Sequence, residues 1–194
     1  MDAKTTGGQA GGGPVSIWTI GHSTLPTDEF LALLRSRGIG LLFDVRRFPA
    51  SRRHPQFGGE ALQASLACEN ILYRHMPALG GRREPRPDSV NTGWRESAFR
   101  GYADHMETPA FQQALSAVVE EAATWCCVPM CAEKDWHNCH RGLIADSLKA
   151  VGRDVVHIVD AARDEPHPWT GVARMVGGKL SYAADAPAQS SLGF

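Results

Sequence analysis

The sequence contains no apolar run of the eighteen or so residues that a membrane-spanning helix requires, so no membrane partner is expected. Its first four residues also lack the basic and then apolar segments of a secretory signal. The five cysteines are an odd number, which does not suit a disulfide framework where such a signal is absent. We therefore expect a protein of the cytoplasm with reduced thiols.

Lysine is also scarce, because only 4 of the 20 basic residues are Lys and the other 16 are Arg. The net charge of −1 does not by itself indicate a nucleic-acid partner. Seven of the arginines form two clusters, Arg46, Arg47, Arg52 and Arg53, and Arg82, Arg83 and Arg86. The planar guanidinium suits bidentate binding of phosphate or carboxylate, so the clusters predict an anion site. The alternative is a solvated basic loop in each case.

Short apolar runs alternate with amphipathic stretches along the chain. The runs predict strands over residues 15–20, 41–45, 71–75, 125–130 and 155–159. Helices are expected between them, with Thr27 and Thr108 as N-caps of two of them. This alternation predicts a single α/β domain over residues 15–182, with a mostly parallel five-stranded sheet and helices on both faces.

The remaining segments carry weaker patterns. Residues 1–14 are predicted to be a disordered Gly-rich tail, and residues 183–194 a flexible one. Residues 77–97 read as a long loop, of the kind that is functional or mobile. An edge hairpin is expected around Gly177-Gly178.

Polar side chains follow four of the predicted strands. They belong to Gly21-His22-Ser23, Asp44-Val-Arg46, His75 and Cys131-Ala-Glu133. Because ligands of parallel sheets bind beyond the carboxyl ends of the strands, these segments are expected to converge on one site.

The stretch from Cys131 to Arg141 is the richest in reactive groups. Cys139 and His140 precede a predicted helix, whose N-terminus lowers a thiol pKa, so Cys139 is a candidate nucleophile. The alternative is a half-buried structural cysteine. Glu133 is a candidate general acid or base, or else the partner of Arg141 in a structural ion pair.

The same stretch offers metal ligands, namely Cys131, His137, Cys139 and His140. Their spacing is poor for structural zinc, which favours paired Cys-x₂₋₄-Cys knuckles. A metal site completed by His22 or His75, or a haem site, remains an alternative.

Other residues are candidates for binding substrate. Asp44 is expected to position Arg46, while Arg46 or Arg52 binds the anion; the alternative for Asp44 is a buried cap of the loop. Four aromatic residues could stack a nucleobase or simply pack in the core, namely Tyr73, Trp94, Tyr102 and Trp136.

Together these motifs resemble the family called domain of unknown function 488. The matching segments are Thr19-Ile-Gly-His-Ser23, Asp44-Val-Arg46, Phe48-Pro-Ala-Ser-Arg52, Pro55-Gln-Phe57, Leu79-Gly-Gly-Arg82, Phe99-Arg-Gly-Tyr-Ala103, Cys131-Ala-Glu133 and Cys139-His-Arg141. The resemblance covers about residues 17–160 and implies a compact α/β domain, but no agreed activity. It favours the motif positions His22, Ser23, Asp44, Arg46, Arg52, Glu133, Cys139, His140 and Arg141 as the site.

The leading hypothesis is an intracellular enzyme, a cysteine- or glutamate-dependent hydrolase or transferase, that acts on a phosphate-bearing anion such as a nucleotide or nucleic acid. Glu133, Cys139, His140 and Arg141 are its candidate catalytic residues. Its candidate substrate-binding residues are His22, Ser23, Asp44, Arg46, Arg52, Tyr73, Arg82 and Tyr102. The alternatives are a nucleic-acid-binding module without catalysis and a metal or haem protein.

Overall fold

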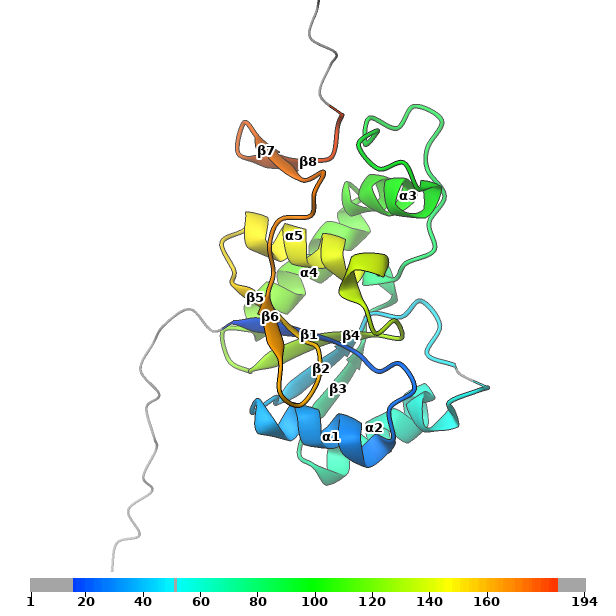
Figure 1. Ribbon diagram of the computed structural model, residues 1–194, viewed down its shortest axis with the longest axis vertical. Coiled ribbons are helices and arrows are strands. Elements are labelled where there is room, and N and C mark those ends of the chain that lie inside the picture. The colour runs from blue at the N-terminus through cyan, green and yellow to red at the C-terminus, as the bar shows by residue number, and fades with distance from the viewer. Residues whose placement is uncertain (1–15, 51, 185–194) are drawn as a thin grey trace, which may run out of the picture.

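A six-stranded sheet forms the centre of the molecule (Figure 1). The computed structural model describes residues 16–50 and 52–184, so the first predicted tail and most of the second lie outside the described residues. The strands are β1 Ile17–Gly21, β2 Leu41–Asp44, β3 Leu72–His75, β4 Cys127–Cys131, β5 Val155–Ile158 and β6 Asp164–Pro166, in the spatial order β3-β2-β4-β1-β5-β6. The first five are parallel and β6 is antiparallel, so the predicted mostly parallel α/β sheet is confirmed.

The sixth strand corrects the expected count of five. β6 has the sequence Asp-Glu-Pro, which shows no apolar alternation, and it adds to the open edge of β5 through backbone pairing. The predicted hairpin is present as β7 Arg174–Val176 and β8 Lys179–Ser181, but it forms a separate two-stranded sheet. It therefore does not extend the edge of the main sheet.

Helices cover both faces of the sheet (Figure 1). α1 Thr27–Ser36 and α2 Gly59–Cys68 lie on one face, and α3 Ser97–Met106, α4 Pro109–Glu121 and α5 Arg141–Ala150 lie on the other. Two separate hydrophobic clusters fill the space between these layers and the sheet. The residues of β2 and β4 are buried because helices cover both faces of the sheet. None of the described helices combines the length and apolar content of a membrane span.

One of the two predicted N-caps is confirmed and the other is wrong. The Thr108 side chain accepts a hydrogen bond from the Phe111 N–H, as expected of an N-cap. The N-cap prediction for Thr27 is wrong, because α1 already includes Thr27 and follows Pro26 without a side-chain cap. α3 was not predicted, since Gly101 and Asp104 interrupt its apolar face although both are buried.

The long loop predicted at residues 77–97 is hydrogen-bonded to α3. The Tyr102 hydroxyl donates to the Leu79 carbonyl at 2.7 Å, and His105 Nε2 donates to the Ala78 carbonyl at 2.7 Å. The Asp104 carboxylate accepts hydrogen bonds from Ser89 and Asn91 farther along the loop. Helix α3 thereby fixes the start of the loop beside the carboxyl end of the sheet.

The connections diverge around β4, which lies between β2 and β1. The chain leaves β1 and β2 toward α1 and α2 on one face, but it leaves β4 toward α5 on the other face (Figure 1). Loops that separate in this way open a crevice beyond the strand ends. The fold therefore provides a site next to the segments that follow β1, β2 and β4.

Candidate functional site

A pocket of about 920 Å³ opens at the carboxyl ends of β1, β2 and β4. Its volume lies within the usual range for small-molecule sites. Among the residues that line it are the predicted His22, Ser23, Arg46, Arg52, Arg82, Tyr102, Glu133, Cys139 and His140. The structure thus brings together most of the residues that the sequence singled out.

Five arginines make the pocket strongly basic, namely Arg46, Arg47, Arg52, Arg53 and Arg82. Of the described residues that line it, only Glu96 and Glu133 carry carboxylates. Ser23 and Arg82 both adopt left-handed backbone conformations, with φ of 47° and 60°. Such conformations in non-glycine residues cost energy and concentrate at functional sites.

The Arg46 guanidinium is held rigidly in the pocket wall. The fully buried Asp44 carboxylate accepts from Arg46 Nε at 2.8 Å, and also from Arg46 Nη2 and the backbone N–H. The Tyr73 hydroxyl donates to the same carboxylate at 2.9 Å. Neither Asp44 nor Tyr73 lines the pocket, so these two predicted substrate-binding residues contact Arg46 or its partner instead.

His22 holds the other side of Arg46. Its Nδ1–H donates to the Ser23 carbonyl at 2.9 Å, which leaves Nε2 to accept from Arg46 Nη1 at 3.2 Å. Burial, and then the nearby Arg46 charge, lower the pKa of His22 to about 4. The ring is therefore neutral near pH 7, and stacking on Phe57 fixes its plane.

Cys131, Cys139 and His140 meet at the floor of the pocket. His140 Nε2 lies 3.2 Å from the Val45 carbonyl and donates to it, so Nδ1 is the unprotonated nitrogen. This Nδ1 lies 3.8 Å from Cys139 Sγ and 3.9 Å from Cys131 Sγ. A hydrogen bond from Cys131 holds the pKa of Cys139 well below its ordinary value, whereas that bond and burial raise the pKa of Cys131.

Three of the four predicted metal ligands are gathered here. The ligand atoms of Cys131, Cys139 and His140 all lie within 4.8 Å of one another. His137 is the exception, because its Nδ1 lies 2.8 Å from the Asp135 carboxylate on the surface. His22 and His75 bond to other groups and do not join the three. Haem binding by the same stretch stays a prediction.

Arg141 lies behind the pocket and does not line it. Its Nη2 donates to the carbonyls of Glu133 and Lys134, and its Nη1 donates to Thr19 Oγ1 at 3.3 Å. Within the described part of the chain, the expected ion pair with the Glu133 carboxylate does not form; the contact is to the Glu133 backbone. Arg141 therefore braces the loop after β4, while the Glu133 side chain is exposed at the pocket.

A buried chain of hydrogen bonds continues from Thr19 to Asp146. Thr19 Oγ1 lies 2.6 Å from His157 Nδ1, His157 Nε2 lies 2.9 Å from His167 Nδ1, and His167 Nε2 lies 3.0 Å from the Asp146 carboxylate. Because Arg141 only donates and Asp146 only accepts, every bond can point from Arg141 toward Asp146. Burial, and then the charges of His167 and Arg141, lower the pKa of His157 to about 2.

Most of the aromatic residues proposed to stack a nucleobase lie outside the pocket. Trp136 stacks on His157 at 4.3 Å, and Trp94 packs on Phe99 at 4.8 Å. Of the four proposed base-stacking residues, only Tyr102 lines the pocket. The candidate binding residues did not include Arg47, Phe48, Arg53, His54 and Phe99, which also line the pocket, although the first Arg cluster had already assigned Arg47 and Arg53 to the predicted anion site. Most of them adjoin residues of the predicted set, and that proximity was the available signal.

Comparison with known proteins gives one match. The family model described as domain of unknown function DUF488 matches residues 26–148. No curated protein and no solved structure matches the chain. The matched segment contains β2, β3 and β4 and the Cys131–Arg141 stretch. The match spans more than half of the chain, so the chain belongs to the DUF488 family.

Proposed function

We propose that the protein is an enzyme that acts on a phosphate-bearing anion, a nucleotide or nucleic acid, in the basic pocket. One observation carries the proposal: five arginines line the same pocket as Cys139, His140 and Glu133. Arginines alone would support binding only. A thiol and an unprotonated imidazole nitrogen 3.8 Å apart beside them support a chemical step.

The arginines have distinct parts in binding. Arg46 is preorganised by Asp44 and His22, so its free N–H groups bind the anion without a large loss of side-chain entropy. Arg52 and Arg82 are exposed and lie on separate loops, from which they approach the anion from different sides. Bidentate guanidinium contacts then select phosphate groups over uncharged ligands.

The chemical step uses the floor of the pocket. His140 Nδ1 accepts the proton of Cys139, and the Cys139 thiolate forms a bond to the phosphorus. The bond from phosphorus to the ester oxygen breaks, and this oxygen leaves with the electron pair and a proton from Glu133. Water, or a second acceptor hydroxyl, then gives its proton to the Glu133 carboxylate and displaces the thiolate from phosphorus. The thiolate takes back its proton from His140, which makes the enzyme a hydrolase or transferase.

The experiment measures both binding and turnover with phosphate monoesters, nucleotides and a single-stranded oligonucleotide. Arg82→Gln should weaken binding about tenfold, which corresponds to about 1.4 kcal/mol for a charge-assisted contact. Arg174→Gln, on the exposed β7, is the matched control and should leave binding unchanged. Cys139→Ser should retain binding and lower turnover by about 100-fold or more.

Other results would contradict the proposal in distinct ways. Salt-dependent binding without turnover of any of these ligands by the unaltered protein would identify a non-catalytic nucleic-acid-binding module. Turnover that survives both Cys139→Ser and Glu133→Gln would rule out the chemical step. Absence of binding to every phosphate-bearing ligand would overturn the anion site as well.

A second candidate function is metal binding by the same floor. Two sulfurs and one imidazole nitrogen resemble the three-ligand sets of catalytic zinc sites, which keep a fourth position open. The hydrogen bond from His140 Nε2 to Val45 is the type that orients metal-bound histidines. Elemental analysis of the purified protein should then give about one zinc per chain, and Cys131→Ser should reduce it. A metal-free protein that takes up no added zinc would exclude this candidate.

A further inference from the structure

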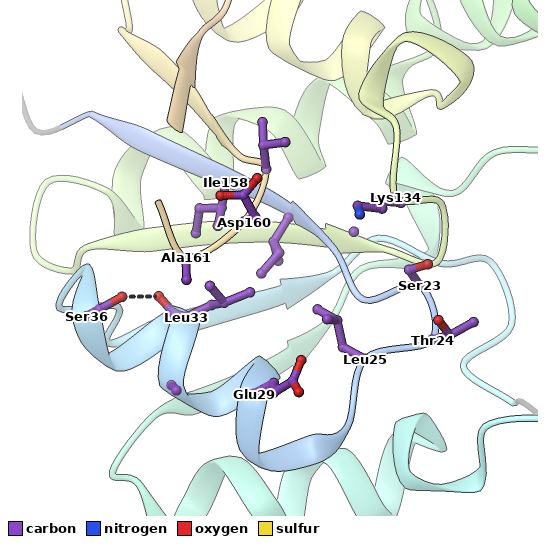
Figure 2. Close-up of a pocket in the computed structure, with 14 residues that line it drawn as sticks. Ser23, Thr24, Leu25, Glu29, Leu33, Ser36, Lys134, Ile158, Asp160 and Ala161 are labelled. Atoms are coloured by element: carbon purple, nitrogen blue, oxygen red, sulfur yellow. Dashed lines mark hydrogen bonds between the residues drawn. The ribbon is translucent and has the colours of Figure 1, made fainter. Parts of the chain in front are cut away.

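A second cavity, of about 590 Å³, lies on the α1 side of the carboxyl end of β1 (Figure 2). Its walls come from the end of β1, from α1 and from the segment that follows β5. In Figure 2 the Leu33, Ile158 and Ala161 side chains surround this space, with Leu25 and Glu29 on the side toward the start of α1. The proposed chemistry uses none of these side chains.

The two cavities share residues of the loop between β1 and α1. Ser23 and Thr24, between β1 and α1, line both of them. Ser23 adopts the left-handed conformation, so a strained turn lies at the boundary between the cavities. A molecule bound to the arginines would therefore lie next to the second cavity, on the other side of this turn.

The interior of the second cavity is chemically unlike the basic pocket. Its floor consists of Ile20, Leu33 and Ile158, which are buried members of the hydrophobic cluster under α1. None of the described residues that line it is an arginine. The cavity therefore suits the uncharged, flat or apolar part of a ligand and not a second phosphate group.

Polar groups are confined to its border. Lys134 lies near Ser23, whereas the carboxylates of Glu29 and Asp160, both on exposed residues, lie at parts of the border farther from Ser23 (Figure 2). Carboxylates only accept hydrogen bonds, so they favour a ligand that carries N–H or O–H donors. An amino-substituted heterocycle has this combination of an apolar face and edge donors.

We propose that the second cavity binds the nucleobase of a nucleotide whose phosphate occupies the basic pocket. The inference rests on the proposed function, because it takes the phosphate position from that pocket. It narrows the substrate class to nucleotides with an exocyclic amino group. Lys134 then lies between the base and the phosphate, and its positive charge favours the phosphate.

The test compares three probes that share one phosphate: inorganic phosphate, ribose 5-phosphate and adenosine 5′-monophosphate. Calorimetric binding to the full chain should be at least about tenfold tighter for the nucleotide than for ribose 5-phosphate. Ala32→Phe fills the second cavity from the exposed face of α1 and should abolish that difference. Binding of inorganic phosphate should stay unchanged in the same variant.

Ala64→Phe is the matched control, since Ala64 is an exposed helical alanine on α2 that lines neither cavity. It should preserve the preference for the nucleotide. Equal affinity for the nucleotide and ribose 5-phosphate, or a preference that survives Ala32→Phe, would overturn the base site and leave the anion site standing. Failure of all three probes to bind would instead count against the proposed function.

Discussion

Replacement of Asp146 by asparagine is expected to lower the free energy of unfolding by about 3–5 kcal/mol. Asp146 and Arg141 are buried charges, 0 % and 1 % exposed, and the Thr19–His157–His167 chain joins them. The amide keeps the shape of the carboxylate but removes the negative charge that accepts the last hydrogen bond of the chain from Arg141, the one from His167. Its N–H₂ group also replaces one of the two oxygens that accept hydrogen bonds, Oδ1 from His167 and Thr170 and Oδ2 from Tyr182.

Urea denaturation measures this loss directly. Asp88→Asn is the matched control, because the Asp88 side chain is 89 % exposed and a substitution there should change stability by less than about 0.5 kcal/mol. A loss below about 1 kcal/mol in the Asp146 variant would show that the chain does not couple the two charges energetically.

The second large effect is expected from Gly21→Ala. A Cβ atom at Gly21 would lie 1.8 Å from the Glu133 carbonyl oxygen and 2.8 Å from Arg141 Nη2. The loop after β4 must therefore move away from β1 and give up its hydrogen bonds to Arg141. We expect a loss of stability of about 3 kcal/mol, together with faster reaction of Cys139 with a thiol reagent as the floor of the pocket opens.

Gly171→Ala provides the comparison for this substitution. A Cβ at Gly171 would meet no atom within 4 Å, so its stability and thiol reactivity should match those of the unaltered protein. If Gly21→Ala behaved in the same way, the close approach between β1 and the loop after β4 would not support the pocket.

The sequence predicted the layers of the fold well because each depends on a local pattern. The apolar runs of β1, β2, β4 and β5 and the periodic face of α4 are visible within short windows. β6 and α3 were missed for the opposite reason. The first is stabilised by pairing with β5, and the second buries Gly101 and Asp104 against the long loop, neither of which a local pattern reveals.

The site was predictable to the extent that parallel strands end at one edge. His22, Arg46 and Glu133 follow β1, β2 and β4, and their convergence required only the strand order around the crevice. His75 is the last residue of β3, at the edge of the sheet, and its Nε2 donates to the Arg46 carbonyl outside the pocket. Strand order does not predict the direction in which a side chain at a strand end points.

The sequence by itself determined that reactive groups and arginines would meet at the end of a parallel sheet. Only the tertiary structure decided which of them line the pocket and which support its walls. Arg141 stands two residues after Cys139, yet it turns away from the pocket toward Thr19, which is 122 positions distant along the chain. The reason is physical: the buried Nη groups of Arg141 need acceptors. Thr19, His157 and Asp146 come within reach of one another only when β1, β5 and α5 pack together.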